Sequence, residues 1–161
     1  MAACEYTSSA SRANFASAET AAKKLGLQVI GYAIKSADEL KTTIAGLPTE
    51  QATALFQIAD DLFESQFEFL FDTARAKKLP TMFNEESWAI RGALAAYGPS
   101  YIEMGRQAAG LVNQIIKGEN PESLPIVHAD KFDLTLNYRT ARFLDVRFPP
   151  ELLKKAAKVI R

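Results

Sequence analysis

The side chains best suited to chemistry in this sequence follow short apolar runs. They fall into four groups along the chain: Thr7, Ser8 and Ser9; Asp60; Asn84 and Glu85; and Tyr97 and Gly98. If the apolar runs are parallel strands, their carboxyl ends lie at one edge of a sheet, so these groups converge there. Carboxylates at such an edge suit the ammonium of a small zwitterion, whereas hydroxyls and free N–H groups at helix starts suit its carboxylate. The alternative is that these residues are only helix caps and turn formers.

No catalytic constellation stands out in the sequence. His128 is the single histidine and lies beside Asp130 in a polar stretch, which favours an ordinary exposed residue over a catalyst or metal ligand. The adjacent carboxylates Asp60 and Asp61 are a weak metal signal by themselves. Gly92 and Gly98 do not fit a dinucleotide-binding fingerprint, and the sequence has no phosphate-binding loop. We therefore expect a protein that is not an enzyme and that uses no metal and no cofactor.

Composition limits the classes of partner. The 161 residues fit one ordinary domain, and the formal net charge of zero gives no case for nucleic acid. Residues 131–161 hold eight Lys and Arg against three Asp and Glu, but Phe, Leu and Val alternate with them as in a folded element. Cys4 is the only cysteine, so an internal disulfide is impossible. No apolar run approaches the roughly 18 to 20 residues that cross a bilayer, and no apolar signal segment precedes Cys4.

The elements that would position these residues alternate between strand and helix. Apolar and β-branched runs predict strands at residues 27–34, 53–59, 80–83, 93–97 and 132–137. Helical patterns are predicted at residues 11–24, 36–46, 63–78, 99–117 and 138–144, with a single turn capped by Asn84 and a last basic helix from Pro149 to Arg161. Alternation of this kind is typical of a three-layer α/β fold, a wound parallel sheet with helices on both faces. The strand expected before the first helix is short and weak, so the chain is expected to begin inside a domain.

The order of these segments resembles the substrate-binding proteins of ABC transporters, in particular the tryptophan- and tyrosine-type amino-acid binders. The resemblance is strongest from Pro80 onward, in the YGP turn at residues 97–99, the KGENPESLP stretch at residues 117–125 and the KFDLTLN strand at residues 131–137. It covers almost the whole chain but only about the second half of a full family member. Ala59 stands where the family usually has proline, and Asn84 stands where glycine is common.

The resemblance implies one lobe of a two-lobed, periplasmic-binding-protein-like fold, in which ligand lies in a cleft that closes by hinge motion. Residues 1–120 would be the ligand-binding second lobe with a degraded first strand, and residues 121–161 a hinge-return strand and C-terminal helices. Within that lobe, the resemblance assigns ligand-facing positions to Thr7, Ser8, Ser9, Asp60, Asn84, Glu85, Tyr97 and Gly98.

The function implied is capture of a small solute, such as an amino acid or related compound, for uptake through a membrane permease. The location implied is the periplasm or cell surface, although this chain has no signal peptide. A separate first lobe or a second copy of the chain is a further expected partner, and nucleic acid is not. The alternative is a truncated, non-transporting fragment that acts as a structural or interaction module.

Overall fold

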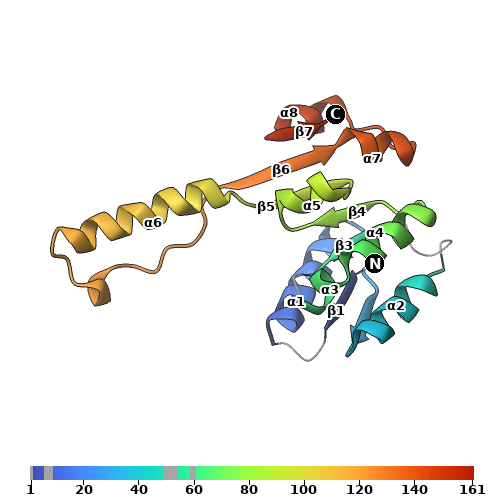
Figure 1. The fold of residues 1–161 in the computed structure, drawn as a ribbon, viewed down its shortest axis with the longest axis horizontal. Coiled ribbons are helices and arrows are strands. Elements are labelled where there is room, and N and C mark those ends of the chain that lie inside the picture. Colours follow the sequence, from blue (N-terminus) through green and yellow to red (C-terminus); the bar gives the residue numbers. More distant parts are fainter. Residues whose placement is uncertain (1, 6–8, 49–53, 59–60) are drawn as a thin grey trace.

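The computed structural model describes residues 2–5, 9–48, 54–58 and 61–161. Its strands form one sheet in the order β2-β1-β3-β4-β5-β6-β7 (Figure 1). All neighbouring strands are parallel except β5 and β6, which are antiparallel. The bounds of the strands are β1 Ala2–Glu5, β2 Gly31–Ile34, β3 Leu55–Gln57, β4 Thr81–Phe83, β5 Ala95–Pro99, β6 Phe132–Asn137 and β7 Lys158–Ile160. The predicted α/β fold with a mainly parallel sheet is confirmed.

Helices fill most of the connections between the strands. They are α1 Ser9–Lys24, α2 Ala37–Ala45, α3 Asp61–Ser65, α4 Phe67–Ala76, α5 Glu86–Arg91, α6 Tyr101–Ile116, α7 Tyr138–Phe143 and α8 Pro150–Lys155. The helix predicted over residues 63–78 is interrupted at Gln66, which lies between α3 and α4. The start of α2 follows the predicted capping box, because the Ser36 side chain accepts a hydrogen bond from the Glu39 N–H.

Helices pack on both faces of the sheet near β2. On one face, Ile34 belongs to the main core with Leu40 and Ile44 of α2 and with the aromatic cluster around Phe63 and Phe83. Three positions earlier in the same strand, a Cβ added to Gly31 would overlap the Phe15 ring of α1. Side chains an odd number of positions apart in a strand point to opposite faces, so α1 covers the face opposite α2.

The first strand, which the sequence predicts to be short and weak, is present and four residues long. Residues Ala2–Glu5 lie between β2 and β3 and pair with both in parallel register. Pairing on both sides satisfies the backbone N–H and C=O groups of the strand. This pairing uses the backbone alone, so it does not require large apolar side chains. The short run is therefore a central strand of the sheet.

Helix α6 does not pack on the sheet (Figure 1), so the prediction that the helix at residues 99–117 covers one of its faces was wrong. The helix projects away from the sheet, and the segment after it runs back beside it (Figure 1). None of its residues is buried. The helix and its return segment begin and end at one point of the sheet, which we call the neck. There Pro99 pairs with Phe132, and the Ser100 N–H donates to the Lys131 carbonyl at 2.9 Å. Because the neck lies at the carboxyl end of β5, the helix continues outward past the edge of the sheet.

The C-terminal segment returns to the sheet. The helix predicted through Arg161 ends at Lys155, and residues Lys158–Ile160 form β7 instead. Val159 and Ile160 are β-branched, which favours a strand. Pairing of β7 with β6 also satisfies the backbone groups on the outer edge of β6. The aromatic and aliphatic side chains of this segment are expected to be more exposed than the core. This expectation is confirmed, because Phe132 and Phe143 are exposed and Leu134, Phe148 and Leu152 are only half-buried.

Candidate ligand-binding site

Three of the eight predicted site residues, Thr7, Ser8 and Asp60, lie outside the described residues. Ser9 is the exposed first residue of α1, which follows the carboxyl end of β1. Asn84 and Glu85 come directly after β4, and Tyr97 and Gly98 lie within β5. We call the edge formed by the carboxyl ends of β1, β3, β4 and β5 the carboxyl rim.

Gly98 brings the end of β5 against the loop after β4. A Cβ added to Gly98 would overlap the Asn84 carbonyl oxygen and would lie 2.6 Å from the Asn84 carbonyl carbon. It would also lie 3.4 Å from the Cα atom of Glu85. Only glycine allows this approach without displacing the backbone. Asn84, Glu85 and Gly98 are therefore in direct contact, as expected for residues at one rim.

Glu85 has two hydroxyl donors. The Tyr101 hydroxyl, from the first turn of α6, donates to Glu85 Oε2 at 3.3 Å, and the Ser87 hydroxyl donates to Glu85 Oε1. Partial desolvation of the Tyr101 hydroxyl raises the pKa of this tyrosine, and the Glu85 charge and hydrogen bond raise it further. The phenol therefore stays protonated and remains a donor to the Glu85 carboxylate. This pair fixes the orientation of a half-buried carboxylate at the rim.

Gln57 is a rim residue that the sequence reading missed. Its side chain is buried at the end of β3, where Oε1 accepts from the Asn84 N–H at 3.4 Å. Its Nε2 donates to Glu64 Oε1 of α3 at 3.2 Å. Gln57 thus connects β3, α3 and the loop after β4. The signal available in the sequence was Gln57 itself, a polar amide inside the apolar run TALFQIA. A buried amide is stable at such a position only when its polar atoms are hydrogen-bonded.

Asn84 does not cap α5 as predicted. The capping position is Glu85, and it makes no side-chain capping bond. The Asn84 Oδ1 atom is buried and has no hydrogen-bond partner among the described residues. An unsatisfied buried acceptor is costly, so this oxygen is a candidate contact for a donor that approaches the rim.

Tyr97 lies next to Gly98 in β5, but its side chain points to the other face of the sheet. Adjacent residues of a strand point to opposite faces, so the tyrosine ring lies on the face away from the Asn84 loop. The ring is 52% exposed and stacks on Phe132, with the ring centroids 5.8 Å apart. The structure therefore brings Asn84, Glu85 and Gly98 together and places the Tyr97 side chain apart from them.

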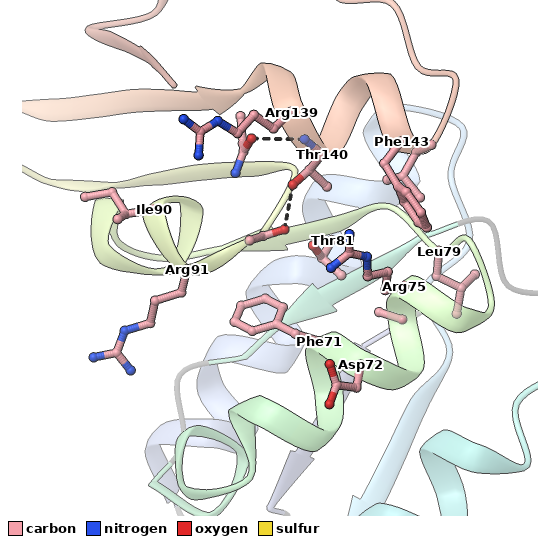
Figure 2. Close-up of a pocket in the computed structure, with 14 residues that line it drawn as sticks. Phe71, Asp72, Arg75, Leu79, Thr81, Ile90, Arg91, Arg139, Thr140 and Phe143 are labelled. Atoms are coloured by element: carbon pink, nitrogen blue, oxygen red, sulfur yellow. Dashed lines mark hydrogen bonds between the residues drawn. The ribbon is translucent and has the colours of Figure 1, made fainter. Parts of the chain in front are cut away.

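A cavity lies at the opposite end of the sheet from the carboxyl rim. Its volume is about 370 Å³, and α4, α5, α7 and the start of β4 line it. Figure 2 shows the Arg75 side chain reaching between Thr81 and Phe143, while Arg91 points away. The Arg75 guanidinium lies 4.7 Å from the centroid of the Phe143 ring, and Thr140 donates to the Gly92 carbonyl. None of the eight predicted site residues lines this cavity.

Two other expectations from the sequence concern metals and membranes. Among the residues that the structure describes, no group of three or more His, Cys, Asp or Glu side chains is placed to hold a metal ion. Over the same residues, no helix has the length and apolar character that a membrane span requires.

Comparison with known proteins identifies the family. A family model described as ABC transporter substrate binding protein matches residues 2–160. The chain belongs to this family. One relative of the chain is the tyrosine-binding protein of Clostridioides difficile (strain R20291), 26% identical over 126 residues. That match covers 78% of this chain and 36% of the relative.

Solved structures share the fold of this chain. An ABC domain from Streptococcus pneumoniae in complex with L-Trp superposes with a TM-score of 0.85 at 23% identity, covering 99% of this chain and 54% of the neighbour. A conserved domain protein from Vibrio cholerae O1 biovar eltor gives a TM-score of 0.84 at 22% identity, covering 98% of this chain and 53% of the neighbour. The chain thus spans about half the length of these structures and about a third of the curated relative.

Proposed function

We propose that this chain is the solute-binding component of an ABC transporter and contributes one side of a cleft that takes an amino acid or related compound. The observation that supports this most directly is the contact among Asn84, Glu85 and Gly98 at the carboxyl rim in a chain of this family. In this proposal, the chain binds the solute and delivers it to a membrane permease at the periplasmic or cell-surface side. It involves no enzymatic step.

The chemistry of the rim suits an amino-acid backbone. Glu85 offers a carboxylate held by Tyr101 and Ser87, which pairs with an ammonium group. Ser9 and the start of α1 offer a hydroxyl and N–H groups to a carboxylate. Asp60, Thr7 and Ser8 stay predictions of the same kind, with Asp60 as a second partner for the ammonium. Support for this ligand class comes from the neighbour in complex with L-Trp and the relative named for tyrosine.

The rim is one half of a binding cleft in this proposal. Ligand sites that hold small molecules tightly bury most of the ligand surface, which a single open rim does not. The chain covers 54% of the L-Trp neighbour, which leaves room in the complete fold for a facing lobe. We therefore expect the chain alone to bind its solute weakly, with a Kd on the order of millimolar.

A structural or interaction module is the second candidate function. Helix α6 has no buried residue, and this favours an interaction module. An exposed amphipathic helix of this length offers a surface on which another protein can pack. In that case the chain would dock on a partner without binding an amino acid.

Ligand-observed NMR separates the two functions. Saturation-transfer spectra of L-Tyr and L-Trp with the isolated chain should show weak binding that Glu85→Gln and Asp60→Ala reduce. Loss of a charged hydrogen bond should cost about 1.5–3 kcal/mol of binding free energy. Glu68→Gln, an exposed carboxylate on α4, is the matched control and should leave the spectra unchanged. Signals that are absent, or equal in all four proteins, contradict the binding function and favour the interaction module.

A further inference from the structure

The cavity between α4, α5 and α7 has the size of a small-molecule site. Its volume of about 370 Å³ falls within the roughly 300–1,000 Å³ that such sites occupy. It lies at the end of the sheet opposite the carboxyl rim, and no described side chain of the rim lines it. A ligand bound in this cavity would therefore leave the rim free.

Arg75 brings to the cavity a positive charge that has no ion-pair partner in the described part of the chain. Its guanidinium lies 4.7 Å from the centroid of the Phe143 ring, and this contact holds the planar group at the cavity wall. Asp72 also lines the cavity, but it is exposed, and Figure 2 shows its carboxylate apart from the Arg75 guanidinium. The N–H groups of the guanidinium are therefore available to an anion.

The end of α4 does not require the Arg75 side chain as a cap. Basic side chains near the end of a helix can donate to its last carbonyls. Here backbone groups do so instead, because the Lys77 N–H donates to the Thr73 carbonyl at 3.0 Å and the Leu79 N–H donates to the Ala74 carbonyl at 2.8 Å. The position of Arg75 at the cavity is therefore not explained by helix capping.

The Thr81 hydroxyl is a second donor at the same cavity. The residue is 4% exposed, and its oxygen accepts a hydrogen bond from the Leu94 N–H at 3.1 Å. This bond fixes the oxygen but leaves the hydroxyl hydrogen unused, and no acceptor for that hydrogen is found among the residues that the structure describes. The Arg75 side chain reaches toward Thr81 (Figure 2). Because an unsatisfied buried donor is costly, this hydroxyl favours a ligand that brings an acceptor.

The rest of the cavity wall includes apolar side chains. Phe71, Leu79 and Leu144 line it, and Leu79 is buried. An inorganic anion would leave this apolar surface unfilled, whereas an apolar group attached to the anion would cover it. One guanidinium and one hydroxyl match the single charge and the two oxygens of a carboxylate. The wall and the donors together fit an organic carboxylate better than a phosphate ion.

We propose that this cavity binds a small organic carboxylate with a compact apolar body. The carboxylate oxygens accept hydrogen bonds from the Arg75 guanidinium and the Thr81 hydroxyl, and the apolar body packs on Phe71 and Leu79. The site is separate from the carboxyl rim, so this inference does not depend on the proposed function.

The test is protein-observed NMR of the isotope-labelled chain, titrated with benzoate and with hexanoate. Benzamide and hexanamide are the ligand controls, because each keeps the apolar body of its acid and removes the charge. Arg75→Gln removes the guanidinium from the cavity. Arg142→Gln is the matched variant, because Arg142 is an exposed arginine of α7 that does not line the cavity.

The expected result is a shift of the Thr81 and Thr140 amide signals with at least one of the two carboxylates, with a Kd on the order of millimolar. Arg75→Gln should weaken this binding by at least about fivefold, whereas Arg142→Gln should leave it unchanged. Glu85→Gln should also leave it unchanged, which separates this site from the amino-acid site. The proposal is overturned if these signals do not move, if signals move only at the carboxyl rim, if the neutral amides act equally, or if both arginine variants weaken binding equally.

Discussion

Gly98 is the residue at which the carboxyl rim tolerates least change. Alanine at this position would force the Asn84 carbonyl away from β5, because the added Cβ overlaps it. We expect Gly98→Ala to lower the free energy of unfolding by about 1–3 kcal/mol, as overpacking does in well-packed regions. Urea denaturation followed by circular dichroism measures the change. Gly110→Ala in α6 is the control: its added Cβ meets no atom within 4 Å, and it should be neutral or stabilising. Equal losses in both variants would contradict the close approach.

Tyr101 provides a pH-dependent test of the Glu85 pair. Its pKa is raised above the ordinary value of 10.0, first by desolvation and then by the Glu85 charge. The folded chain therefore holds this proton more tightly than the unfolded chain, so the contribution to stability is full below pH 10.0 and is lost as the pH rises through the folded pKa. The difference in phenolate absorbance between the wild type and Tyr101→Phe should have its midpoint above pH 10.0, and Glu85→Gln should lower that midpoint. A midpoint at or below 10.0 would contradict the pairing.

The sequence predicted part of the candidate site. Asn84, Glu85 and Gly98 could be placed at one edge, because each follows or ends an apolar run and parallel strands share their carboxyl side. The contacts of Gln57 and Tyr101 could not be predicted, since they join residues of different elements through side-chain geometry. The direction of the Tyr97 ring depends on strand register, which a single sequence leaves open.

At the scale of elements, Asn137 attaches the C-terminal segment to the lobe. Its buried side chain donates to the Ala89 carbonyl at 2.8 Å and accepts from the Thr140 N–H at 3.0 Å, so it connects β6, α5 and α7. Asn137→Ala should lower the free energy of unfolding by about 2 kcal/mol, the sum of a lost helix cap and of one lost buried hydrogen bond to the Ala89 carbonyl, which keeps its bond from the Gly92 N–H. Thermal or urea denaturation measures this loss. Asn113→Ala on the exposed side of α6 should change stability by less than about 0.5 kcal/mol; a comparable loss there would contradict the role of Asn137.

The elements that the sequence predicted correctly are those with local signals. Ser36 and Glu39 set the start of α2, and the apolar runs of β2 to β6 follow strand composition. The sequence reading missed β7 and the outward direction of α6, because both depend on contacts distant in the sequence. An amphipathic pattern reports that a helix has an apolar face, but not which surface covers that face.

At the scale of the whole molecule, the carboxyl rim and helix α6 meet at one neck, where Pro99 pairs with Phe132. The rim presents polar groups that suit a small solute, and in the proposed function it is one half of a cleft whose other half comes from a facing lobe. Glu85→Gln tests the rim itself, because it removes the charge that pairs with an ammonium group.

The most direct test of the proposed half-cleft is the affinity for L-Tyr and L-Trp, measured by titration calorimetry on this chain with and without the unmatched lobe of the Streptococcus pneumoniae neighbour. The expected Kd is on the order of millimolar for the chain alone, and binding should be at least about tenfold tighter with the facing lobe present. Glu85→Gln should weaken binding in both states, whereas the control Glu68→Gln should leave it unchanged. Tight binding by the chain alone, or binding that the facing lobe does not tighten, would contradict the proposed function.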